Sequence, residues 1–137
     1  MNATRIATAL ALVTGVFIIY TGITFLIDPV ATASGFGLPA WPEGEAAGFL
    51  NVKGDRDIAS GLVILALVAL RQRLALGVAM LAMTAAPFGD MLIVLSRGGS
   101  TALAFGMHGV AAAIVATSGI LLLREHRKSA TTQPLTV

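Results

Sequence analysis

The chain has 137 residues, of which 56% are hydrophobic and 12% are charged, and its mean hydropathy is +0.87. Because soluble domains carry about a quarter charged residues, this composition indicates one small integral membrane protein without a sizeable soluble domain. The absence of cysteine excludes disulfides, thiolate catalysis and cysteine-ligated metal centres.

Four apolar segments are each long enough to cross a hydrocarbon core about 30 Å thick, which takes roughly 20 helical residues. They cover about 6–27, 46–70, 74–96 and 102–123. Their apolar runs are long and lack sustained alternation, which indicates helices and not barrel strands. The sequence therefore predicts an all-α membrane protein, a four-transmembrane-helix bundle over residues 1–123, with the lipid bilayer as its partner. A basic cytoplasmic tail over 124–137 is predicted to fray in its last residues.

The first segment ends at Asp28, because a residue that precedes proline is pushed out of the helical region. Arg5 before an apolar run would also fit a cleaved signal peptide, but this run is longer than a typical signal sequence, which favours a span. In the Gly/Pro-rich loop that follows, Trp41 is typical of an anchor at the membrane interface. In the third segment Pro87 removes a backbone donor, which predicts a kink.

Small residues in the later segments predict close contact between membrane helices. They are Gly54, Gly61, Gly106, Gly109, Ala113 and Gly119.

The distribution of Lys and Arg predicts that both termini are cytoplasmic. The expected location is a bacterial inner (plasma) membrane. The inner side then carries Arg5, Arg71, Arg73, Arg124, Arg127 and Lys128, whereas the outer turns hold only Arg97. Basic residues at helix ends also account for the formal net charge of +2 without a nucleic-acid partner.

The second segment carries the charged run KGDRD in its first half, within NVKGDRDIASGL at residues 51–62. Helical spacing places Lys53, Arg56 and Asp57 on one face and Asp55 nearly opposite. Lys53 and Asp57 are four positions apart, the spacing at which side chains on a helix meet, so they are predicted to pair. In the alternative interpretation, these charges lie among lipid headgroups at the mouth of the helix.

Two further ionisable residues, Asp90 and His108, reach the level of Asp57. At about 1.5 Å per residue, Asp57, Asp90 and His108 lie roughly 20, 24 and 22 Å from the cytoplasmic ends of their helices. The short Asp90 side chain needs a partner, and Lys53 and Arg56 are the nearest basic residues, so we expect one shared buried network. His108 alternatively forms a neutral hydrogen bond across helices. A metal is not expected, since Lys53 and Arg56 would oppose a divalent cation, and no cofactor is predicted.

The motif KGDRDIASGL, with APFGD on the next segment and GMHG on the last, resembles a known family. It is that of small bacterial and fungal four-helix membrane proteins catalogued as domain of unknown function 4267. The strongest element is Lys53-Gly54-x-Arg56-Asp57 followed by Gly61, and the resemblance spans nearly the whole chain. The overall design is also similar to that of DoxX-like proteins. The resemblance implies a four-span bundle and no established activity.

Three classes of function fit these residues, and the sequence favours the first. In the first, Lys53, Arg56, Asp57, Asp90 and His108 form a polar pocket that binds a small amphipathic molecule or a lipid headgroup. In the second, Asp57 or Asp90 is the general base and His108 the acid of an isomerase or hydratase, with Arg56 or Lys53 stabilising an anion on a lipophilic substrate. In the third, Asp90 and His108 titrate in a proton-linked transporter, which would require a homo-oligomer.

Overall fold

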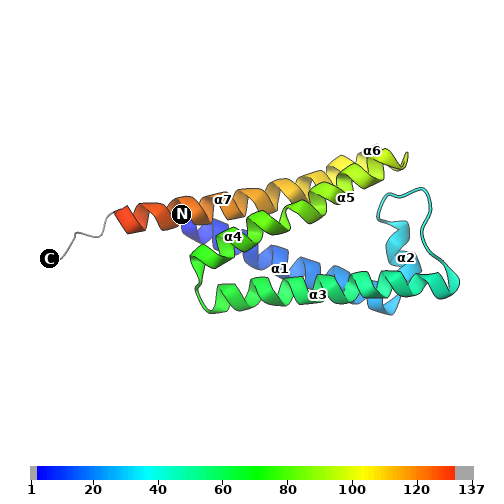
Figure 1. Cartoon of the computed structure of the whole chain (residues 1–137), viewed down its shortest axis with the longest axis horizontal. Coiled ribbons are helices and arrows are strands. Elements are labelled where there is room, and N and C mark those ends of the chain that lie inside the picture. The colour runs from blue at the N-terminus through cyan, green and yellow to red at the C-terminus, as the bar shows by residue number, and fades with distance from the viewer. Residues whose placement is uncertain (1–2, 132–137) are drawn as a thin grey trace.

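The structure, a computed structural model, describes residues 3–131, which form helices without a strand (Figure 1). The predicted all-α class is confirmed. The elements are α1 (Ala3–Ile27), α2 (Pro29–Ser34), the 3₁₀-helix η1 (Gly44–Ala47), α3 (Gly48–Ala69), α4 (Arg73–Met83), α5 (Ala85–Ser96), α6 (Thr101–Leu103), the π-helix η2 (Ala104–Gly109) and α7 (Val110–Thr131). α1 packs along α3, α4 packs along α7, and α1 also contacts α7. The start of α1 and the end of α7 lie at the same end of the molecule (Figure 1).

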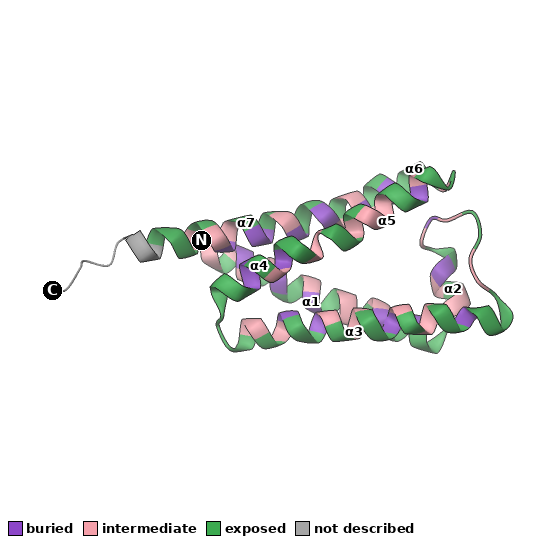
Figure 2. Cartoon of the chain, viewed as in Figure 1, coloured by how far each residue is buried: buried purple, intermediate pink, exposed green. Residues whose placement is uncertain are grey.

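Three segments of the described chain are long and apolar enough to cross a membrane, which indicates an integral membrane protein. They are Ala3–Ile27, Arg73–Ser96 and Thr101–Lys128. Large apolar side chains such as Phe17 and Phe88 are exposed, and exposed residues occur along each long helix (Figure 2), as lipid contact requires. α3 has 22 residues, but its charged run lowers its apolar character, so the fourth span stays a prediction.

The predicted segment 74–96 is interrupted in the structure. α4 ends at Met83 and α5 begins at Ala85. Pro87 lacks the amide hydrogen that would bond the Met83 carbonyl four residues earlier, which explains a break at Thr84. The backbone stays helical at Thr84, with φ −58° and ψ −27°, so the predicted kink stays a prediction.

The last helix also departs from its predicted end. α7 continues to Thr131 without ending at Leu123, so the first part of the predicted tail is helical. The final residues, which were predicted to fray, lie outside the described residues.

Glycines allow α1 and α3 to approach closely. A Cβ atom added at Gly54 would lie 2.6 Å from the Gly22 carbonyl oxygen, and one at Gly61 would lie 2.7 Å from that of Gly15. Such distances leave no room for a side chain, so the predicted role of Gly54 and Gly61 in helix contact is confirmed. Gly106, in contrast, faces open space.

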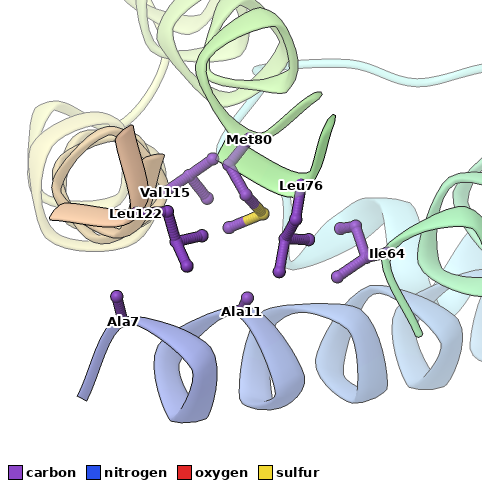
Figure 3. Packing of buried hydrophobic residues seen from close by; sticks show 7 residues of the cluster. All are labelled: Ala7, Ala11, Ile64, Leu76, Met80, Val115 and Leu122. Atoms are coloured by element: carbon purple, nitrogen blue, oxygen red, sulfur yellow. The ribbon is translucent and has the colours of Figure 1, made fainter. Parts of the chain in front are cut away.

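A hydrophobic core holds the helix pairs together near the start of α1. Its buried residues are Ala7, Ala11, Ile64, Leu76, Met80, Val115 and Leu122 (Figure 3). Beside them the buried Ser118 hydroxyl donates to the Ala7 carbonyl oxygen at 2.9 Å, which links α7 to α1. The charged run of α3 lies toward the other end of the molecule, beside α2 and the loop that follows it (Figure 1).

Candidate functional site

The loop after α2 is held against the helices by local capping and by hydrogen bonds across the fold. The Asp28 carboxylate accepts a hydrogen bond from the Ala31 amide at 3.1 Å and starts α2, which turns the chain back toward the bundle. Gly37 has a φ of +103°, a conformation that favours glycine. Its carbonyl oxygen accepts from the Ser100 amide at 2.8 Å. These contacts place Phe36 between α3 and η2.

Lys53 and Asp57 form the predicted ion pair. The Lys53 Nζ lies 2.5 Å from the Asp57 Oδ2, and 33% and 18% of the two side chains are exposed. The same Nζ lies 4.5 Å from the centroid of the Phe25 ring and 5.5 Å from that of Phe36. One carboxylate and two aromatic faces therefore hold the ammonium group.

The other two charges of the run are exposed. Asp55 faces away from the pair, as its helical position predicts. The Arg56 side chain makes no ion pair or hydrogen bond with any residue in the described range 3–131. The expectation that Arg56 joins a buried network is corrected: it lies at the edge of the arc that Lys53 and Asp57 share, where its long side chain reaches outward.

His108 is buried, with 5% of its surface exposed, and lies in the π-helix η2. Because a carbonyl oxygen only accepts, its Nε2 carries a hydrogen and donates to the Phe36 carbonyl oxygen at 2.8 Å. The two rings are also in contact, with centroids 4.4 Å apart and planes inclined by 54°. In the alternative interpretation from sequence, His108 bonds across helices, whereas the structure gives a bond to the loop. π-helical turns often occur at functional sites. No residue pattern in the sequence predicted the π-helical turn at His108.

Asp90 faces His108 and not a lysine or arginine. Its Oδ2 lies 4.0 Å from the His108 Nδ1, and 33% of its side chain is exposed. Within residues 3–131, no Lys or Arg is in ion-pair contact with it.

The predicted single buried network is therefore not supported. The structure forms two separate pairs, Lys53 with Asp57 and Asp90 with His108, and only His108 of the five candidate residues is buried. Phe36 lies between the pairs, because its ring faces Lys53 and its carbonyl bonds His108. The sequence did not identify Phe36 as a site residue, because it lies in an irregular loop to which helical periodicity does not apply.

A pocket of about 100 Å³ adjoins Lys53 where the loop meets α1 and α3. Its lining residues are Phe25, Ala33, Phe36, Leu38, Trp41, Pro42, Leu50 and Lys53. The pocket surface is almost wholly apolar, although Lys53 and Trp41 are among its lining residues, so the predicted polar pocket is corrected to an apolar one. Asp57, Asp90 and His108 do not line it. The Trp41 Nε1 is buried and has no hydrogen-bond partner among the described residues.

The family model described as "Domain of unknown function (DUF4267)" matches residues 15–122, a range that contains every candidate site residue. Comparisons with curated proteins and with solved structures gave no significant match. Since the matched range covers more than half of the 137 residues, the chain belongs to the DUF4267 family, as the KGDRD motif predicted.

Proposed function

We propose that this protein binds one end of a small amphipathic molecule in the pocket beside Lys53. The observation that carries the proposal is an apolar pocket whose wall contains a lysine fixed by Asp57 and two aromatic rings. Ligand sites in proteins combine apolar walls with a few placed polar groups in this way. The proposal replaces the five-residue polar site with a smaller one that keeps Lys53.

The size of the pocket limits what it holds. Pockets that enclose a whole drug-sized ligand measure roughly 300–1,000 Å³, so a volume of about 100 Å³ accommodates only a few non-hydrogen atoms. The remainder of the ligand would extend outward into the lipid. A molecule with a compact polar head in the pocket and an apolar body in the lipid fits these dimensions.

Two residues that line the pocket, Lys53 and Trp41, carry hydrogen-bond donors that suit an acceptor on the ligand. Lys53 retains ammonium hydrogens that are not directed at Asp57. A buried indole hydrogen without an acceptor costs about 1–3 kcal/mol, which an acceptor oxygen on the ligand would offset at Trp41. The head group is therefore an oxygen acceptor, such as a carboxylate, carbonyl or hydroxyl group.

The enzyme and transporter alternatives have weaker support. The His108 Nε2 donates to Phe36 and its Nδ1 faces Asp90, so neither ring nitrogen is directed into the pocket. An acid–base role for Asp57, Asp90 and His108 would require the loop to move away from η2. Transport through so small a chain would additionally require a homo-oligomer.

The membrane arrangement is part of the proposal. α3 packs along α1, which is a span by length and composition, and this supports α3 as the fourth span of a four-helix bundle. Basic residues gather where α1 begins and α7 ends, which supports cytoplasmic termini. A bacterial inner membrane is part of the same proposal. The Lys53 pocket then lies toward the outer face.

A thermal-shift screen in neutral detergent tests the binding proposal. The probes are quinones, isoprenoid alcohols, sterol-like lipids and medium-chain fatty acids, and a ligand of the folded state raises the melting temperature. Trp41→Phe keeps the aromatic ring but removes the indole donor. We expect this variant to fold normally and to lose most of the shift that the wild type shows.

Arg56→Gln is the matched control for charge, because it removes a cation one turn or less from Lys53 without touching the pocket. It should respond to the probes as the wild type does, whereas Lys53→Gln should not. The proposal fails if no probe stabilises the wild type, or if Arg56→Gln and Lys53→Gln lose the shift equally.

A further inference from the structure

A second cavity lies at the opposite end of the molecule, where α3 turns into α4. Its volume is about 240 Å³, and its lining residues are Thr8, Leu67, Val68, Arg71, Arg73 and Leu76. Two guanidinium groups and several apolar side chains thus share one concave surface. None of the lining residues is acidic.

Neither arginine is neutralised within the fold. Arg71 and Arg73 are exposed, and neither side chain forms an ion pair or hydrogen bond with any residue in the range 3–131. Two like charges two positions apart repel each other, and the low-dielectric edge of a bilayer strengthens that repulsion. An anion bound between them would relieve it.

The turn that presents these arginines has an unusual backbone. Arg71 has a φ of +55°, the only positive φ of a non-glycine residue in the described chain. The turn is fixed by its backbone, because the Gln72 amide donates to the Leu67 carbonyl oxygen at 3.0 Å. A glycine would adopt this conformation without strain, so the arginine is retained there at a cost to folding.

We propose that this cavity binds the phosphate group of an anionic phospholipid. Guanidinium groups bind phosphate oxygens through paired, charge-assisted hydrogen bonds. Leu67, Val68 and Leu76 form an apolar surface for the first part of the acyl chains, which a free anion would not contact. The site lies at the basic end of the membrane-spanning helices, where headgroups are found. It is separate from the Lys53 pocket and does not depend on that proposal.

The test is thermal unfolding of the purified full chain in neutral detergent. Phosphatidylglycerol, phosphatidylcholine or inorganic phosphate is added to the wild type, to the double variant Arg71→Gln/Arg73→Gln and to the control Arg5→Gln/Arg124→Gln. The control removes the same charge from exposed residues that do not line the cavity. We expect phosphatidylglycerol to raise the melting temperature of wild type and control, but not that of the double variant.

Arg71→Gly keeps the test decisive if the double variant folds poorly. It removes one guanidinium and relieves the strained backbone, so it should melt higher than the wild type without lipid and gain less from phosphatidylglycerol. Equal stabilisation by inorganic phosphate or by phosphatidylcholine would overturn the lipid assignment. If the Arg5→Gln/Arg124→Gln control loses the shift equally, the stabilisation reflects general surface charge. That result would also overturn the proposed site.

Discussion

The imidazole of His108 donates from its Nε2 to the carbonyl oxygen of Phe36 at 2.8 Å, although 72 positions separate the two residues. This bond joins the loop after α2 to η2. The Phe36 ring in turn faces Lys53 and lines the pocket. The position of Phe36 in the pocket wall therefore depends on its hydrogen bond to His108, a residue that does not line the pocket.

Replacing His108 with leucine should free the loop. The substitution removes the donor to the partly buried Phe36 carbonyl oxygen, so we expect a loss of about 1 kcal/mol of unfolding free energy. His108→Gln should lose less, because its amide can still donate. Denaturant unfolding measures both, and labelling of a cysteine placed at Ala40 reports the loop. Equal labelling rates in wild type and His108→Leu would contradict this role of His108.

The Lys53–Asp57 pair should show energetic coupling in a double-mutant cycle. Lys53→Met leaves the Asp57 carboxylate unpaired, whereas adding Asp57→Asn removes that charge. Because both side chains are partly exposed, we expect a coupling of only about 1 kcal/mol. The parallel cycle between Arg56→Met and Asp57→Asn should show almost none. Comparable couplings in the two cycles would mean that Asp57 has no preferred partner.

The contact between Gly22 and Gly54 predicts a strong effect of added methyl groups. Gly54→Ala would place its Cβ 2.6 Å from the Gly22 carbonyl oxygen, so α1 and α3 must separate. We expect a loss of about 1–3 kcal/mol, as for other overpacked sites. Gly89→Ala is the control, since nothing lies within 4 Å of its added Cβ and alanine favours helix by about 1 kcal/mol. A Gly54→Ala variant that melts like Gly89→Ala would disprove the close contact.

Residue patterns predicted the helices and one ion pair well, because both are local properties. Apolar length fixes a membrane helix, and a separation of four positions brings Lys53 to Asp57. The partner of Asp90 was predicted wrongly, since it depends on the loop and on the π-helical turn at His108, which no local period encodes. The pocket was missed for the same reason: Phe36 and Leu38 come from an irregular segment.

The fourth span is open to a direct test, because the chain has no native cysteine to interfere with labelling. Single cysteines at Ala40, in the loop before α3, and at Gln72, in the turn after it, flank this helix. If α3 crosses the membrane, a membrane-impermeant thiol reagent applied to intact cells labels Ala40→Cys and spares Gln72→Cys until the membrane is opened.

A cysteine at His126, near the end of α7, completes the assignment of sides. It should behave as Gln72→Cys does, because α1 begins and α7 ends at the basic end, which the positive-inside rule places in the cytoplasm. Labelling of Ala40→Cys and Gln72→Cys from the same side would show that α3 does not cross. Labelling of Gln72→Cys and His126→Cys in intact cells, with Ala40→Cys protected, would instead preserve four spans and reverse the orientation.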